Sequence, residues 1–156
     1  ALAQARPADA GALFWAGYGW AGWINLSKDS PDAVADLPKV VAVMERVQEL
    51  SPGFYFGGPD LFLGSYYAIR PRLLGGDPAK SKAHFEAALR LSAGRFLMAK
   101  VLYAQYYAVA AQDPELFRQV LGETLEASPD LPHARLANAV AKLKAKRLME
   151  RTDELF

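Results

Sequence analysis

Short sequence tags recur along this chain about every forty residues, and they constrain its fold more than any other feature. A serine-containing tag closes three apolar stretches, and a tag with aspartate or serine before proline opens the following ones. The closing tags are Leu50-Ser51-Pro52, Leu91-Ser92-Ala93 and Ala127-Ser128-Pro129, and the opening tags are Asp29-Ser30-Pro31, Asp77-Pro78 and Asp113-Pro114. Proline cannot continue a helix, whereas an aspartate cap followed by proline starts one. The tags therefore predict a series of helix pairs.

A third tag places a small residue in the first helix of each pair, at Ala21, Gly64 and Ala104. Small residues there let a neighbouring helix approach closely. The spacings are 43 and 40 residues, compared with about 34 in a standard tetratricopeptide repeat. In the middle pair, Ser81, Phe85 and Ala88 follow the second-helix half of the tetratricopeptide pattern. We therefore expect elongated tetratricopeptide-like repeats.

The expected fold is an all-α, tetratricopeptide-like helix-pair solenoid in a single domain, residues 1–156. The expected pairs are 10–27 with 32–50, 59–74 with 78–91 and 96–111 with 114–127, and a final helix over about 132–152 covers the end. The aromatic run 54–56 is too short for a strand and is cut off by Gly57-Gly58-Pro59.

The final helix is expected to act as a polar cap on the repeats. Its basic residues are Lys142, Lys144, Lys146, Arg147 and Arg151, and its apolar stripe consists of Leu136, Val140 and Leu143. We interpret the basic run as the solvated face of the cap, with a site for an anionic partner as the alternative.

Composition narrows the function classes. With 52% hydrophobic and 22% charged residues, the chain has the composition of a soluble globular protein. The net charge of +1 provides no general attraction for phosphate, so no nucleic-acid partner is expected.

The absence of cysteine excludes disulfides, thiolate metal sites and cysteine nucleophiles. Because it begins at Ala1 without a Met or a leader, the sequence looks like a mature or trimmed fragment.

The uncharged segment from Ala10 to Leu26 is rich in aromatic residues. A membrane-spanning helix needs about 20 apolar residues, and this segment is shorter. It is therefore expected to form a buried, aromatic-lined helix.

Motifs for catalysis or cofactor binding are weak. The run from Gly17 to Gly22 spells G-x-G-x-x-G, but no strand precedes it, so helix packing explains the glycines better than a dinucleotide does. His84 and His133 lie 49 residues apart, outside any metal-ligand spacing. No sequence resembles a nucleophile elbow, and His84 is expected to be an ordinary surface histidine. We predict no enzyme activity, no cofactor and no metal.

The segment Arg70-Pro71-Arg72 has two interpretations. In the first, Pro71 ends a helix, Gly75-Gly76 turns the chain and both arginines are solvated. In the alternative, Pro71 kinks a continuing helix and aims one arginine at an anionic group.

The first helices of the pairs are expected to line a concave groove. The residues predicted to bind an apolar ligand with one polar end are Trp15, Tyr18, Asn25, Leu61, Ser65 and Gln105. Gly22, Ala68, Val101 and Ala108 lie on the same predicted faces. The alternative is that neighbouring helices fill this space and that the aromatic residues belong to the core.

Several stretches resemble one known family, the T-component proteins of TRAP (tripartite ATP-independent periplasmic) transporters. The similar stretches are Tyr55-Phe56-Gly57-Gly58-Pro59, the segment 72–77 leading into His84-Phe85-Glu86-Ala87-Ala88, the segment 100–107, the segment 136–142 and the C-terminal Asp153-Glu154-Leu155-Phe156. Together they cover nearly the whole chain.

The resemblance implies a tetratricopeptide-like periplasmic lipoprotein that associates with the substrate-binding subunit of a TRAP system and carries a hydrophobic groove or pore. It implies no catalytic residue. The family's lipid-bearing cysteine and an N-terminal helical portion are not in this sequence, so contact with a membrane is expected only through that anchor. A homo-oligomer and a generic protein-docking scaffold stay open as alternatives.

Overall fold

A computed structural model describes residues 2–156, and this part of the chain is helical without any β-strand. The all-α prediction is therefore confirmed. The chain forms two compact units, one ending at Pro59 and the other running from Asp60 to Phe156. The single-domain organisation stays a prediction.

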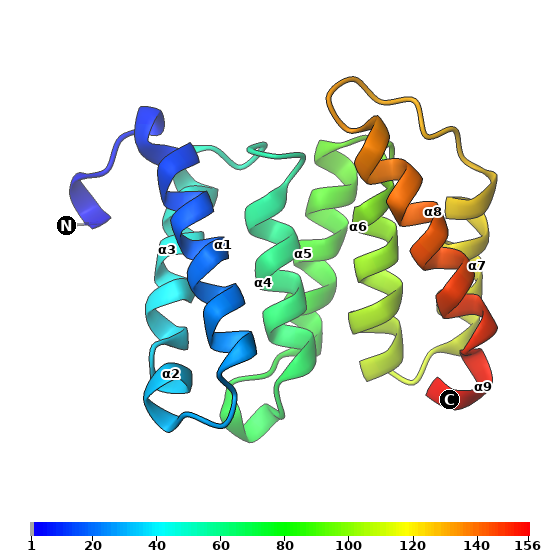
Figure 1. The fold of residues 1–156 in the computed structure, drawn as a ribbon, viewed down its shortest axis with the longest axis horizontal. Helices are drawn as coiled ribbons and strands as arrows, with labels where there is room; N and C mark the ends of the chain where they lie inside the picture. The colour runs from blue at the N-terminus through cyan, green and yellow to red at the C-terminus, as the bar shows by residue number, and fades with distance from the viewer. Residues whose placement is uncertain (1) are drawn as a thin grey trace. The chain divides into compact units, whose positions relative to one another are not determined.

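Unit 1 is built on one long helix that packs against a second. Two short 3-10 turns, Leu2–Gln4 and Pro7–Asp9, precede α1 (Ala10–Leu26), which is followed by α2 (Pro31–Ala35) and α3 (Leu37–Leu50), as Figure 1 shows. Helices α1 and α3 lie side by side. A Cβ atom on Gly17 would stand 3.1 Å from both Met44 Cε and Val43 Cγ1. Helix packing therefore explains why position 17 is a glycine.

The structure interrupts the helix predicted over residues 32–50. Helix α2 ends at Ala35, and α3 begins at Leu37 after a turn at Asp36. The ring nitrogen of Pro38 has no hydrogen to donate to the preceding turn, so one continuous helix would lose a backbone hydrogen bond at this point. The prediction of a single helix was wrong here.

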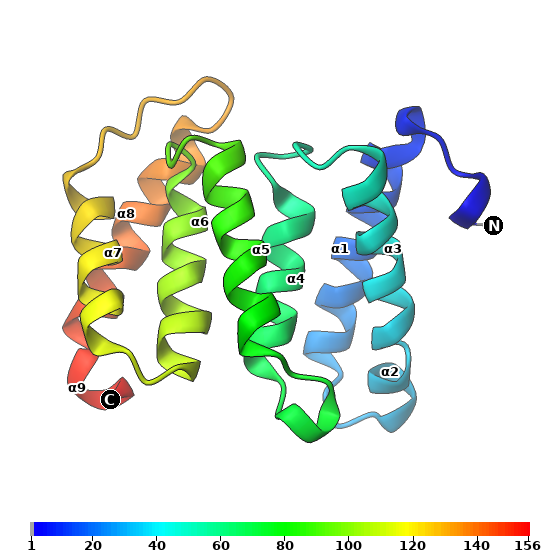
Figure 2. The same cartoon turned by 180° about the vertical axis from the view of Figure 1, so that it is seen from behind.

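Helix α4 (Gly58–Ile69) begins with the last two residues of unit 1 and otherwise belongs to unit 2. Unit 2 also contains α5 (Pro78–Leu91), α6 (Leu97–Leu102), α7 (Pro114–Glu126), α8 (Arg135–Glu150) and α9 (Thr152–Leu155). A π-helical segment, Tyr103–Ala108, continues α6. Figures 1 and 2 show α4 beside α5, and α6, α7 and α8 in mutual contact. Ser81 Oγ on α5 donates a hydrogen bond of 2.8 Å to the carbonyl of Gly64 on α4.

The predicted start signals act as helix caps. The side chain of Asp77 accepts a hydrogen bond from the amide of Lys80 at 3.0 Å, and that of Asp113 accepts one from Leu116 at 2.9 Å. In the first pair Ser30 takes this role. Each cap precedes a proline at the first helical position, where no N–H is needed.

The interpretation of Pro71 as a helix end is confirmed, although α4 stops at Ile69 and not at residue 74. The chain then forms a 3-10 turn, Arg72–Leu74, and reverses at Gly75, whose φ of 92° suits glycine. Arg70 Nε donates to the carbonyl of Leu74 at 2.6 Å, whereas Arg72 is exposed.

Helix α8 has the opposite orientation to the one its apolar pattern suggests. Its buried residues are Asn138, Ala141 and Ala145, while Leu136 is 78% and Leu143 is 62% exposed. Small side chains let α8 approach its neighbours closely, and Asn138 hydrogen-bonds to backbone groups there. The prediction that the leucine stripe covers the end of the repeats was wrong.

Candidate functional site

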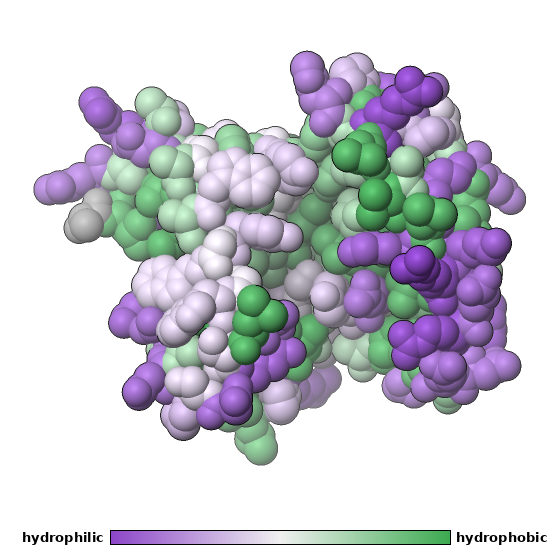
Figure 3. Space-filling view, viewed as in Figure 1, coloured by the Kyte–Doolittle hydropathy of each residue, from purple (hydrophilic) through white to green (hydrophobic). Residues whose placement is uncertain are grey.

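One side of α1 is an uncharged surface rich in aromatic and small residues. The other side of the helix buries Phe14, Gly17 and Ile24. On the open side, Trp15 is 49% and Tyr18 is 58% exposed. Figure 3 shows the surface over α1 as a pale and green area bordered by charged purple groups. We call this side, made of Trp15, Tyr18, Gly19, Gly22, Trp23, Asn25 and Leu26, the α1 face.

The α1 face corrects two expectations. The helix was expected to be buried, but half of the surface of Trp15 and of Trp23 is accessible. A Cβ atom on Gly19 or Gly22 would meet no heavy atom within 4 Å, so helix packing does not explain these two glycines.

The exposed rings at the start of this face rest on an aromatic cluster within unit 1. The ring centroids of Phe14 and Trp15 are 5.0 Å apart, and those of Trp15 and Tyr55 are 5.2 Å apart, both in edge-to-face geometry. Phe54 packs on Phe14 at 5.1 Å. These contacts favour one orientation of Trp15 over others, because edge-to-face pairs contribute about 0.5–1.5 kcal/mol each.

The segment after α3 holds Tyr55 in place through an unusual backbone. Tyr55, Phe56 and Gly57 all have positive φ, at 47°, 58° and 82°. For the two aromatic residues this conformation costs on the order of 1–3 kcal/mol each. A Cβ atom on Gly58 would stand 2.7 Å from the Phe14 ring, so only glycine fits there. The sequence indicated that Gly57-Gly58-Pro59 interrupts the aromatic run, but it did not indicate that Tyr55 would contact Trp15.

The six residues predicted to bind a ligand fall in both units. Trp15, Tyr18 and Asn25 lie on the exposed side of α1 in unit 1. In unit 2, Leu61 is only 6% exposed, and Ser65 Oγ donates a hydrogen bond of 2.8 Å to its carbonyl. Gln105 is half-buried in the π-helical segment. The shared binding role of these residues stays a prediction.

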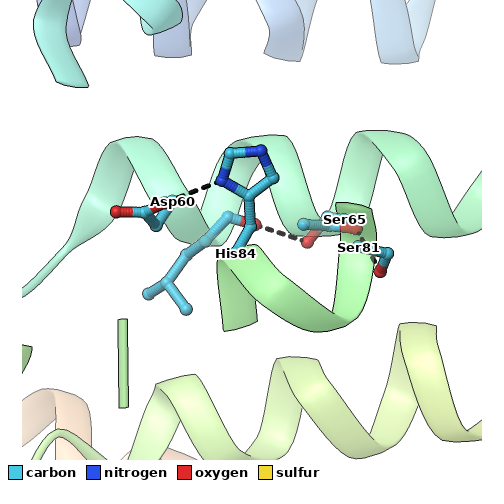
Figure 4. Close-up of polar contacts among 6 residues, drawn as sticks. Asp60, Ser65, Ser81 and His84 are labelled. Carbon is cyan, nitrogen blue, oxygen red and sulfur yellow. Dashed lines mark hydrogen bonds and ion pairs between the residues drawn. The ribbon is translucent and has the colours of Figure 1, made fainter. Parts of the chain in front are cut away.

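Unit 2 contains a histidine–carboxylate pair that the sequence did not reveal. His84 Nδ1 lies 2.7 Å from Asp60 Oδ1, and the Asp60 side chain is 3% exposed (Figure 4). The His84 ring stacks on Tyr67, with centroids 5.7 Å apart and planes 6° from parallel. The expectation of an ordinary surface histidine was therefore wrong. The two partners are 24 residues apart on different helices, so no local pattern could connect them.

The serines near this pair donate their hydroxyl protons to the backbone. Ser65 Oγ donates to Leu61 and Ser81 Oγ donates to Gly64, each at 2.8 Å (Figure 4). A serine nucleophile needs a base to accept its hydroxyl proton, and here carbonyls hold those protons. Residues 2–156 also contain no group of three histidine, aspartate or glutamate side chains placed to bind a metal. The geometry of the pair fits a structural role, in which the contact between Asp60 and His84 holds α4 against α5.

The π-helical segment places two tyrosines against each other. The rings of Tyr103 and Tyr107 stack at 5.2 Å. Burial raises the pKa of Tyr103 to about 12, and the negative charge of Glu86 adds to the shift. Tyr107 also lines an open cleft of about 630 Å³ with Arg72, Gly76, Asp77, Pro78, Ala79 and Lys82. No feature of the sequence distinguished the π-helical segment from an ordinary helix.

Comparison with known proteins decides the family, because the family model for the TRAP transporter T-component matches residues 1–156. The chain belongs to this family. Its resemblance to the family, seen in the sequence, is confirmed. The family is one of transporter components.

One curated relative of this T-component is a longer protein. An uncharacterized protein from Treponema pallidum (strain Nichols) is 23% identical over 156 residues, which cover 99% of this chain and 48% of the relative. The T-component sequence therefore spans about half the length of that relative. Within residues 2–156, no helix combines the length and the apolarity that crossing a membrane requires.

Proposed function

We propose that this chain is a non-enzymatic accessory component of a periplasmic TRAP-type uptake system that binds the substrate-binding subunit of that system. Membership of the TRAP transporter T-component family supports a role in transport. The substrate-binding subunit is the partner that the resemblance of the sequence implies. A lipid anchor at the N-terminus of the full-length protein would hold it at the membrane.

The proposal includes a tetratricopeptide-like stacking of the helix pairs. Within unit 2, α4 and α5 form a close pair, because a Cβ atom on Gly64 would stand 2.9 Å from the Phe85 ring. Ala104, the equivalent small residue of the next pair, is fully buried. Small residues at equivalent positions support a repeated packing geometry.

The exposed side of α1 is the observation that carries the binding part of the proposal. Single exposed apolar residues are common on soluble proteins, but an uncharged helix face with several half-exposed aromatic rings is not. Burying one such ring against a ligand or a partner contributes roughly 1.5–3 kcal/mol. The cluster around Phe14 and Tyr55 orients Trp15 in advance, which lowers the entropy lost on binding.

We further propose that the ligand is apolar with one polar end. Trp15 and Tyr18 would contact its apolar part, and the exposed amide of Asn25 would orient its head group, since few polar groups in a mainly apolar site are usual.

Co-purification from the native periplasm tests the partner. Tagged full-length protein should retain the substrate-binding subunit of its TRAP system after washing. If it instead retains peptides or unrelated proteins and never that subunit, a generic docking scaffold becomes the better account.

Tryptophan emission tests the ligand. Titration with a medium-chain fatty acid should shift the emission of the native protein, and Trp15→Ala should remove a saturable part of that shift. Trp20→Ala is the matched control, because Trp20 is a tryptophan of the same helix that lies outside the α1 face. A shift that is unchanged by Trp15→Ala would exclude this site.

A further inference from the structure

Helix α8 carries an apolar stripe that points away from the core. Leu136, Val140 and Leu143 follow one another at helical spacing, and all three are exposed. The residues on the opposite side, Asn138, Ala141 and Ala145, are fully buried. The packing of α8 therefore relies on its small residues, and the stripe adds little to the stability of the fold.

The α8 stripe is bordered by basic residues. Helix α8 contains five basic residues and one acidic residue, a net charge of +4, whereas the whole chain carries +1, so the remainder of the chain is net −3. Figure 3 shows the exposed apolar groups on this helix surrounded by purple charged groups. The positive charge of the protein is concentrated on this one helix.

Three of these cations have no partner among residues 2–156. Lys144, Lys146 and Arg147 are exposed and make no hydrogen bond or ion pair with any of those residues. Arg135 pairs with Asp130 at 3.2 Å, but both side chains are exposed, so this pair contributes little. An acidic partner could approach the three unpaired cations without first breaking an internal ion pair.

We propose that the α8 stripe and its basic border form a docking surface for a partner protein that presents an apolar groove edged by acidic side chains. The inference rests on the proposed function, in which this partner is the substrate-binding subunit. An apolar centre with a polar rim is the usual composition of a protein interface, and complementary charges accelerate the encounter.

An anionic membrane surface fits this helix less well. Helices that lie in the membrane interface usually place Trp or Phe with Leu on their apolar face, and the α8 stripe has aliphatic residues only. Arg147 follows Leu143 by one turn, so a charge interrupts the stripe at its C-terminal end. A carboxylate at one end of a protein groove would match this charge.

Binding of full-length variants to the immobilised substrate-binding subunit, followed by biolayer interferometry, tests the apolar part. Leu136→Ser combined with Leu143→Ser should weaken binding at least about tenfold, because residues at an interface centre carry most of the affinity. The matched control combines Leu73→Ser with Leu74→Ser, which are also exposed in unit 2 but lie outside α8. This control should bind like the wild type.

Charge reversal tests the basic border. Lys144→Glu combined with Arg147→Glu should slow association and reduce its dependence on salt, since long-range attraction controls the encounter rate. Arg90→Glu combined with Arg118→Glu is the control, because both arginines are exposed on other helices of unit 2. Circular dichroism of each variant establishes that the fold is intact, and the two pairs of substitutions test the surface independently.

The outcomes separate this inference from the proposed function. If the subunit binds the wild type and both α8 variants equally, the proposed function stands and the docking surface is wrong. If the subunit does not bind the wild type, both are wrong. If the wild type instead sediments with vesicles of equal phosphatidylglycerol and phosphatidylcholine, and the α8 variants do not, the stripe is a membrane surface and the proposal is overturned.

Discussion

Asn138 on α8 accepts a hydrogen bond of 2.8 Å from the backbone amide of Leu97 at the start of α6. Its own amide group donates to the carbonyls of Arg95 at 2.8 Å and Pro129 at 3.3 Å. The first turn of α6 has no cap from its own N-cap residue, Phe96. A fully buried side chain from a helix 41 residues further along the chain therefore caps α6 and fixes which side of α8 faces inward.

Asn138→Ala should destabilise the protein by about 2–4 kcal/mol, because it leaves the buried amide of Leu97 without a partner and removes two part-buried hydrogen bonds to the carbonyls of Arg95 and Pro129. Asn25→Ala is the matched control, since Asn25 is exposed on α1, and its effect should stay within about 0.5 kcal/mol. Urea unfolding followed by circular dichroism measures both. Equal effects of the two substitutions would show that the cap is unimportant.

Gly64→Ala should destabilise unit 2 by about 1–3 kcal/mol, because the added Cβ would stand 2.9 Å from the fully buried Phe85 ring. Gly19→Ala should instead be neutral or stabilising by up to about 1 kcal/mol, since it lies in a helix with open space around it. Thermal unfolding of the two variants compares them directly. A Gly64→Ala protein as stable as the wild type would contradict the close approach of α4 and α5.

Leu136→Ala should change the free energy of unfolding by less than about 0.5 kcal/mol, because Leu136 is exposed. Leu121→Ala on α7 is the comparison, and it should cost about 2–5 kcal/mol because Leu121 is fully buried. Denaturant titration of both variants measures this difference. If Leu136→Ala costs as much as Leu121→Ala, α8 has the orientation that its apolar pattern suggested.

The free energy of unfolding should decrease at alkaline pH because the phenol of Tyr103 loses its proton. Its folded pKa of about 12 lies above the ordinary value of 10.0, so the folded state keeps the phenol proton more tightly than the unfolded state does. The corresponding stabilisation, up to about 3 kcal/mol, is complete below pH 10 and is lost as the pH rises towards 12. Urea unfolding between these pH values should show a smaller decline for Tyr103→Phe than for the wild type, with Tyr66→Phe as the control.

Local sequence signals predicted the helix starts well. Asp77 and Asp113 cap the helices that follow them, and Gly64 lies at a close helix contact. Each of these features depends on a few neighbouring residues or on a recurring small position, so it is visible in one sequence. The break at Pro38 was missed although its signal is local, because the apolar pattern continues across it.

The face of α8 could not be predicted in the same way. Hydrophobicity favoured Leu136 and Leu143 as core, whereas the structure buries Asn138 and two alanines. The reason is a long-range hydrogen bond to Leu97, which no local pattern encodes. The pairing of Asp60 with His84 and the contact of Tyr55 with Trp15 also join residues on separate elements. Such contacts depend on tertiary packing and on the positive φ angles after α3.

Isothermal titration of the purified full-length protein into the substrate-binding subunit of its own TRAP system tests the central claim most directly. The account predicts a saturable heat of binding, whose strength falls with salt as the basic border of α8 is screened. The absence of any binding heat at protein concentrations up to about 100 µM, where even weak complexes form, would contradict it.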